Sequence, residues 1–161
     1  MLINMLGFNL VWFGLVYWGN CFIPIAIFLI CVHLIKLSHF KYEMRLVLLV
    51  TVLGSSIDNI LTFLHVFQFD NTHFTPLWLV VLWASFACTL CHSLRFLDNS
   101  RVMQLLIGGL VSPLSYIAGH KLGAVNFSYS IVMTYSLLAV IWAGLFYLFF
   151  SLKIFLNCKE K

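Results

Sequence analysis

Charged residues are scarce in this chain, and their scarcity decides the class of protein. Asp, Glu, Lys and Arg together make up 9% of its 161 residues, whereas soluble domains carry about 25%. Hydrophobic residues make up 63%, and the mean hydropathy is +1.04. A water-soluble fold of this length cannot bury so much apolar surface. The composition therefore predicts an integral membrane protein and leaves no room for a separate soluble domain.

Signals for processing and for a known chemistry are missing as well. The first hydrophobic segment has no basic stretch before it and no small-residue cleavage site, so we expect it to be retained as a helix. The five cysteines are scattered in apolar context and give no disulfide framework. No nucleophile motif occurs, and the one stretch with the spacing of a cofactor site, residues 88–92, is rejected below, so the sequence by itself names no reaction.

Polar residues divide the chain into six apolar segments, and a helix needs about 20 such residues to cross a bilayer. The predicted helices cover residues 2–18, 22–38, 43–67, 76–96, 101–122 and 128–156. We therefore predict an all-α, polytopic membrane protein that forms a single six-transmembrane-helix bundle over residues 1–161. The expected N-caps of the last three helices are Thr75, Ser100 and Ser128.

Basic residues gather on one side of this predicted bundle. Eight of the nine lie there, namely Lys36, Lys41, Arg45, Arg95, Arg101, Lys153, Lys159 and Lys161. Lys121 lies opposite. The positive-inside rule then places both termini in the cytoplasm, and the size of the protein leads us to expect a bacterial inner membrane. The net charge of +4 follows from this topology, so we expect membrane lipids and no nucleic acid as partners.

Short similarities between the predicted helices suggest a bundle of three repeated helical hairpins. Residues 81–97 and 140–156 share Val, Trp-Ala and a Ser-Leu-basic run at matching positions. Residues 31–37 and 90–96 share His-x-x-basic near a helix end. Transporter folds often contain such repeats. The alternative is that any two helices ending in the cytoplasm acquire a basic terminus.

The stretch CTLCH over residues 88–92 has the spacing by which c-type haem is attached to proteins. It lies within one turn of Arg95, at a predicted cytoplasmic helix end, whereas haem is attached on the outer side of the bacterial membrane. Cys88 and His92 share a helix face, but Cys91 points elsewhere. We therefore reject c-type haem at Cys88, Cys91 and His92, and we expect neither a cofactor nor a metal.

Polar residues inside the predicted spans are costly to bury and therefore informative. One face of the third helix carries Thr51, Ser55, Asp58 and Thr62, and one face of the fifth carries Ser112, Tyr116 and His120. An ionised Asp58 would cost about 2.5–3.5 kcal/mol at this depth, so it must be protonated, hydrogen-bonded or exposed to a water-filled cavity. The helical rise places Asp58 and Tyr116 at similar depths. We predict a hydrogen bond between them, with Thr134 as the second candidate partner.

Two functions fit these positions. The first is binding or transport of a small or lipidic ligand, for which the candidate residues are Asp58, Asn59, Thr62, Ser112, Tyr116 and Thr134. The second is a membrane enzyme or accessory subunit in fatty-acyl modification, with Asp58 exchanging a proton and Tyr116 and His120 assisting. Asp58 can equally be a packing hydrogen bond, and His120 an interfacial residue. His92 and Arg95 are candidates for contact with lipid headgroups, the alternative being a snorkelling helix end.

Three segments carry a family resemblance. They read RLVLLVTVLGSSIDNILTF, PLWLVVLWASFACTLCHSL and SPLSYIAGHKLGAV. Together they resemble a family of small bacterial inner-membrane proteins known as domain of unknown function 2878, and the resemblance covers nearly the whole chain. The matching positions are Asp58, Trp83, His92, Pro113 and Tyr116. The family pattern has no paired cysteines at the CTLCH stretch. The resemblance suggests gene neighbours in membrane-lipid modification, such as cyclopropane fatty-acid synthases, and implies no known activity.

Overall fold

The computed structural model describes residues 2–36, 40–70 and 72–156, most of which lie in helices. The helices are α1 (Leu2–Trp18), η1 (Gly19–Phe22), α2 (Ile23–Lys36), α3 (Phe40–Phe63), α4 (Leu77–Leu90), η2 (Arg95–Leu97), α5 (Arg101–Leu110), α6 (Ser112–Lys121) and α7 (Ile131–Phe155). Two short strands, β1 (Phe67–Gln68) and β2 (Asn126–Phe127), pair antiparallel. The all-α prediction is confirmed, with this two-residue strand pair as a small addition.

Within the described residues, four helical segments are long and apolar enough to cross a membrane. They are Leu2–Lys36, which contains α1 and α2, and Lys41–Phe63, Arg101–Lys121 and Ile131–Phe155. The apolar helix α4 is shorter, with 14 residues. These helices fit a multi-pass membrane protein, while the six crossings and the three hairpin repeats stay predictions. Residues 37 and 38 of the predicted second helix, and Lys159 and Lys161, lie outside the described residues.

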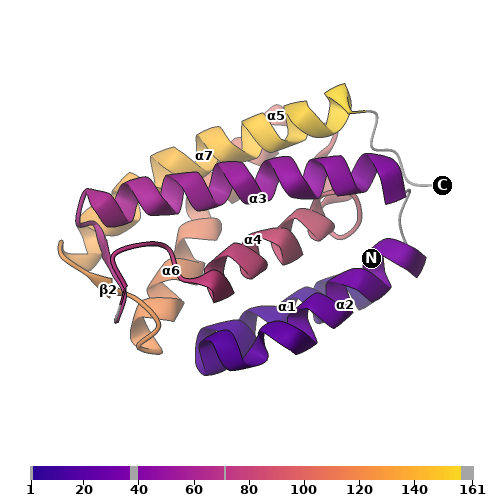
Figure 1. Cartoon of the computed structure of the whole chain (residues 1–161). Helices are drawn as coiled ribbons and strands as arrows, with labels where there is room; N and C mark the ends of the chain where they lie inside the picture. The colour runs from indigo at the N-terminus through magenta and orange to yellow at the C-terminus, as the bar shows by residue number, and fades with distance from the viewer. Residues whose placement is uncertain (1, 37–39, 71, 157–161) are drawn as a thin grey trace.

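Helices α1, α2, α3, α4 and α7 lie roughly along one direction, with α4 in the centre, whereas α6 runs steeply across them (Figure 1). Helices α1, α2 and α3 all pack against α4, and α5 packs along α7. The start of α1 and the end of α7 lie at the same end of the bundle, where α3 also begins (Figure 1). The strand pair β1–β2 and the end of α6 lie at the other end (Figure 1). This arrangement places the end of α2, the start of α3 and the end of α4 next to one another.

Two helices end earlier than predicted. The third ends at Phe63 instead of residue 67, because His65 adopts a left-handed conformation with φ 57°. The backbone N–H groups of His65 and Val66 then bond the carbonyls of Thr62 and Leu61, which is a Schellman motif. The fourth ends at Leu90 instead of residue 96, and turns lead from there into η2.

The predicted fifth helix, 101–122, is divided into α5 and α6 at Val111. Pro113 has no backbone N–H and cannot continue the hydrogen-bond ladder of α5, but it is tolerated in the first turn of α6. Among the expected caps, Ser100 is confirmed, since its side chain accepts from Met103 N. The last helix begins later than predicted and is capped by Ser130 instead of Ser128.

The expected cap at Thr75 is also wrong. The residue before α4 is Pro76, which makes no cap hydrogen bond. The side chain of Asn20, in η1, accepts from Trp78 N in the first turn of α4 at 3.2 Å. The backbone N–H of Thr75 donates instead to Asn59 Oδ1 at 2.8 Å. This bond ties the connection before α4 to the last turns of α3.

Candidate functional site

Asp58 on α3 is the centre of a buried polar cluster between three helices. The residue is 1% exposed. Tyr116 Oη, on α6, donates to Oδ1 at 3.0 Å, and Trp83 Nε1, on α4, donates to Oδ2 at 2.6 Å. Each carboxyl oxygen thus accepts one hydrogen bond, which offsets part of the cost of burying the group. The predicted Asp58–Tyr116 hydrogen bond is confirmed.

Trp83 is the second hydrogen-bond partner of Asp58, and it was not predicted from the sequence. A buried indole N–H usually finds an acceptor, so a tryptophan within the apolar fourth helix was an available signal. The direction in which the Trp83 indole points is set by the packing of α3 and α7 against α4. Trp83 stacks on Trp142 of α7 with 5.0 Å between ring centroids. On its other side lies Gly54 of α3, where a Cβ atom would collide with the indole ring.

Several predicted neighbours of Asp58 are used elsewhere. Thr62 Oγ1 donates to the backbone carbonyl of Asp58 at 2.8 Å, and Asn59 Oδ1 accepts from Thr75 N. Thr134, the second candidate partner, is 1% exposed, and its Oγ1 has no hydrogen-bond partner among the described residues. The structure therefore joins Asp58 to Tyr116 but not to Thr134.

His120 lies at the turn that leads to β2. Its Nδ1 is 2.9 Å from the backbone oxygen of Val125, and its ring stacks on Phe127 with 4.4 Å between centroids. The enzyme hypothesis expects His120 to assist Asp58 and Tyr116. The structure instead engages its ring with the connection between α6 and α7.

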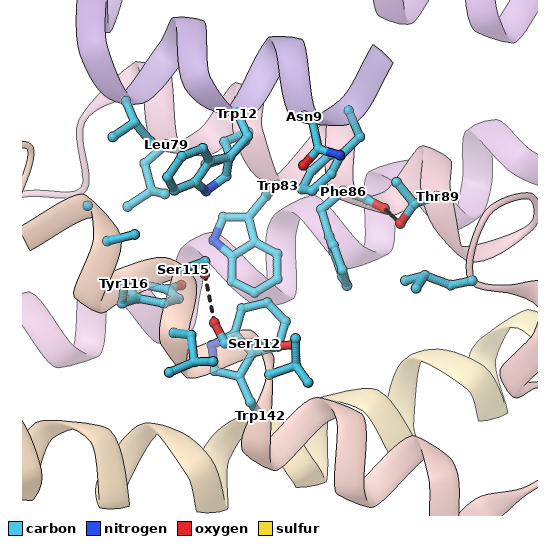
Figure 2. Close-up of a pocket in the computed structure, with 18 of the residues that line it drawn as sticks. Asn9, Trp12, Leu79, Trp83, Phe86, Thr89, Ser112, Ser115, Tyr116 and Trp142 are labelled. Carbon is cyan, nitrogen blue, oxygen red and sulfur yellow. Dashed lines mark hydrogen bonds between the residues drawn. The ribbon is translucent and has the colours of Figure 1, made fainter. Parts of the chain in front are cut away.

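A cavity of about 700 Å³ opens beside this cluster (Figure 2). Residues of α1, α4, α5, α6 and α7 form most of its walls, and aromatic and aliphatic side chains make up most of the lining. Figure 2 shows the indoles of Trp83 and Trp142 and the phenol of Tyr116 on one part of the wall, with Trp12 of α1 facing them. The cavity therefore lies between the N-terminal helix and the rest of the bundle.

Two of the predicted ligand residues line this cavity, Ser112 and Tyr116. The others, among the described residues, lie outside its lining: Asp58, Asn59, Thr62 and Thr134. Trp83 and Tyr116 stand between Asp58 and the cavity, because both line it and both donate to the carboxyl group. Asp58 therefore fixes two side chains of the cavity wall and is itself shielded from the cavity.

A second buried polar cluster surrounds Glu43, at the end of the bundle where α3 begins. Glu43 is 2% exposed. Its Oε1 lies 2.8 Å from His33 Nε2 of α2, and its Oε2 lies 3.1 Å from His92 Nε2, just after α4. The two imidazole rings meet edge to face with 4.7 Å between centroids. Glu43 thus links α2, α3 and α4 through one carboxylate.

Asn4 of α1 joins this second cluster. Its Nδ2 donates to the backbone oxygen of Cys88 at 3.1 Å and lies 3.4 Å from His33 Nδ1. Its Oδ1 accepts from the hydroxyl of Ser93 at 2.6 Å. One amide side chain therefore ties the first helix to α2 and to the end of α4.

The placement of His92 does not fit the expected contact with lipid headgroups. The residue is 8% exposed, and its ring faces Glu43 and His33 in the interior. The early end of α4 accounts for the difference, because the turn after Leu90 directs His92 inward. Arg95 is exposed, and its role at headgroups stays a prediction.

Glu43 is not among the site residues predicted from the sequence. A signal was present, since His33, Glu43 and His92 all fall near the predicted cytoplasmic ends of neighbouring helices. Spacing within one helix cannot reveal the cluster, because each residue comes from a different element.

Basic side chains at this end of the bundle are also engaged. Lys153 of α7 is 6% exposed. Its Nζ donates to both carboxylate oxygens of Asp98, at 2.6 and 2.8 Å, and to the backbone oxygen of Leu90 at 2.8 Å. Arg101 donates to Ser151 Oγ at 3.0 Å and lies over the ring of Tyr147. These bonds hold the end of α7 against η2 and the start of α5.

Comparison with known proteins agrees with the resemblance carried by the sequence. No curated protein and no solved structure matches the chain. The pattern of one family, described as "Protein of unknown function (DUF2878)", matches residues 1–148. The match includes both polar clusters and every described residue that lines the large cavity. The chain therefore belongs to the DUF2878 family.

Proposed function

We propose that this membrane protein binds the acyl chain of a lipid or fatty acid in the cavity between α1, α4, α6 and α7. The observation that carries the proposal is the cavity itself, about 700 Å³ with mostly aromatic and aliphatic walls. Ligand sites in proteins range over about 300–1,000 Å³ and are lined mainly by apolar side chains with few polar groups. The volume and the wall chemistry both fit an apolar ligand.

The polar side chains of the wall support this choice of ligand. Within the described part of the chain, no charged residue lines the cavity. Thr89 and Ser115 donate their hydroxyl protons to carbonyls of their own helices, at 2.6 and 2.7 Å. The hydroxyl of Tyr116 donates to Asp58. Because these donors are engaged within the protein, the cavity is suited to a chain of methylene groups and poorly suited to a charged solute.

The enzyme hypothesis receives less support from this geometry. General acid–base catalysis requires a titratable group within hydrogen-bond reach of the substrate. Asp58 lies behind Trp83 and Tyr116, and His120 faces Val125 and Phe127. Binding of an acyl chain also agrees with an accessory role in fatty-acyl modification.

We further propose a location in a bacterial inner membrane with both termini in the cytoplasm. The support is the asymmetric distribution of Lys and Arg along the sequence. The cluster around Glu43 would then lie near the cytoplasmic face, and the Asp58 cluster in the outer half of the membrane. At the helical rise of 1.5 Å per residue, these two carboxylates are separated by roughly 22 Å along α3.

Tryptophan fluorescence tests the binding proposal, because Trp12, Trp78, Trp83 and Trp142 line the cavity. The protein is reconstituted in lipid nanodiscs of saturated phosphatidylcholine and titrated with a brominated fatty acid, whose bromine quenches indoles on contact. We expect saturable quenching. Quenching that rises only in proportion to the probe dissolved in the bilayer would contradict the proposal.

A matched pair of variants locates the binding. Ser115 lines the cavity, whereas Ser136 of α7 is exposed and lies outside its lining. Both hydroxyls donate to a carbonyl of their own helix, at 2.7 and 2.9 Å. Ser115→Phe fills part of the cavity and should abolish saturable quenching, while Ser136→Phe should leave it unchanged. Equal titrations of the two variants would show that the probe binds elsewhere.

A further inference from the structure

Three potential metal ligands meet at the second polar cluster, and they come from three different helices. A ring nitrogen of His33, a carboxylate oxygen of Glu43 and the sulfur of Cys88 all lie within 4.8 Å of one another. In a tetrahedral zinc site, the bond lengths to N, O and S place neighbouring donor atoms roughly 3.3–3.6 Å apart. Side-chain rotations that shift the donor atoms by roughly 1 Å are enough to reach that geometry.

The charges of these groups also match a divalent cation. All three residues are buried, with Glu43 and Cys88 2% and 4% exposed. A buried carboxylate is costly unless it is paired or coordinates a metal. One divalent ion bound by the carboxylate, the neutral imidazole and the Cys88 thiolate gives a site of zero net charge. The proton of the Cys88 thiol is released on binding.

Outer residues hold the ligands in place, as they do in known metal sites. His92 Nε2 lies 3.1 Å from Oε2 of Glu43, which leaves Oε1 directed to His33. Asn4 bonds the backbone of Cys88 and lies beside Nδ1 of His33. An amide offers this imidazole nitrogen a donor or, after rotation, an acceptor. Each of the three ligand residues therefore has a neighbour that restricts its orientation.

A small cavity of about 160 Å³ adjoins two of the three donor residues, His33 and Cys88. His33, Cys88 and Asn4 lie in its wall, together with residues of α1 and α2. This cavity has room for water or a small molecule beside the ligands. Three protein ligands with an accessible fourth position are the arrangement of catalytic zinc sites, whereas structural zinc sites are closed by four protein ligands.

We propose that His33, Glu43 and Cys88 bind one zinc-class divalent cation, with a fourth coordination position open to the small cavity. His92 is a positioning residue that acts through Glu43. The mixed nitrogen, oxygen and sulfur donor set favours Zn²⁺ over Mg²⁺ or Ca²⁺, which prefer oxygen ligands. This proposal is independent of acyl-chain binding, because the linings of the two cavities, as far as the described residues go, share Phe8 and no other residue.

Cobalt spectroscopy tests the site, because a thiolate ligand gives Co²⁺ a charge-transfer absorption band in the near ultraviolet. The full chain is purified without a histidine tag and titrated with Co²⁺, and its zinc content is measured by plasma mass spectrometry after equilibration with Zn²⁺. We expect about one ion per chain and a thiolate–cobalt band that Zn²⁺ displaces. Absence of the band from the folded wild-type protein would overturn the proposal without any variant.

Two neighbouring cysteines provide a matched control. Cys88 and Cys91 are both buried and adjoin the same turn. Cys88→Ser should abolish the charge-transfer band, whereas Cys91→Ser should retain it. Loss of the band in both variants, or in neither, would refute Cys88 as the ligand. His92→Leu should retain the band but weaken Co²⁺ binding about 10- to 100-fold, because it removes a partner that orients a ligand. An unchanged Co²⁺ affinity would show that His92 has no positioning role at the site.

Discussion

The hydrogen bonds of Asp58 lead to a prediction in which two substitutions at one position differ sharply. Asp58→Asn keeps an oxygen that accepts from Trp83 Nε1. Its amide N–H can donate to the Tyr116 hydroxyl oxygen, so that Tyr116 becomes an acceptor in this bond instead of the donor. Asp58→Leu offers neither group and leaves both donors without their partner. The first substitution preserves the cluster, and the second destroys it.

The magnitudes follow from the two donors. A buried polar group left without a partner costs about 1–3 kcal/mol, so Asp58→Leu should lower the free energy of unfolding by about 2–6 kcal/mol. The lower half of that range applies where water in the cavity reaches Tyr116. Asp58→Asn should cost less than about 1 kcal/mol, because the neutral amide still accepts from Trp83 and donates to the Tyr116 oxygen, whose own proton can then bond water in the cavity.

Thermal unfolding in detergent, followed by intrinsic fluorescence, measures the difference. One kcal/mol corresponds to roughly 2–4 °C in Tm for a chain of about this length, so Asp58→Leu should lower Tm by roughly 4–24 °C. Asp58→Asn should stay within roughly 4 °C of the wild-type Tm. Equal losses in the two variants would refute the reasoning, because they would show that the negative charge itself, and not the hydrogen bonds, stabilises the bundle.

Three further predictions use other features of the chain. Gly54→Ala should lower the free energy of unfolding by about 1–3 kcal/mol, because the new Cβ collides with Trp83. Gly144→Ala has nothing within 4 Å of its new Cβ and should raise that free energy slightly through helix propensity. Unfolding curves that move in the same direction would contradict this. Reporter fusions after Asp70 and after the C-terminus should report opposite sides of the membrane, and a common side would refute the predicted topology. The purified protein should show no Soret absorbance, and a band lost on replacing both cysteines of the CTLCH stretch would restore the haem hypothesis.

The Asp58–Tyr116 contact could be predicted because depth in a membrane follows from residue number. The helical rise and the shared starting face place both side chains at one level, and a polar side chain at that depth must find a partner. The rotation of each helix about its axis does not follow from rise. That rotation decides that Trp83 is the second partner of Asp58 and that Thr134 is not a partner of Asp58.

Helix ends were harder to predict than helices. The apolar run continues through Val111, so hydropathy gives no sign of the break there, and no Gly or Pro follows Leu90 to mark the earlier turn. Pro113 was a local signal for the second break. The first break follows no such residue, yet it places His92 beside Glu43. The Glu43 cluster could therefore not be derived from periodicity in any single helix.

Native mass spectrometry of the protein released from nanodiscs tests the binding of an acyl chain most directly. Nanodiscs of one phosphatidylcholine, doped with one fatty acid, contain the wild-type protein or the Ser115→Phe or Ser136→Phe variant. Acyl-chain binding in the large cavity predicts one retained lipid or fatty acid per chain for the wild type and for Ser136→Phe, and none for Ser115→Phe. Equal retention by all three proteins, or no retention by the wild type, would contradict it.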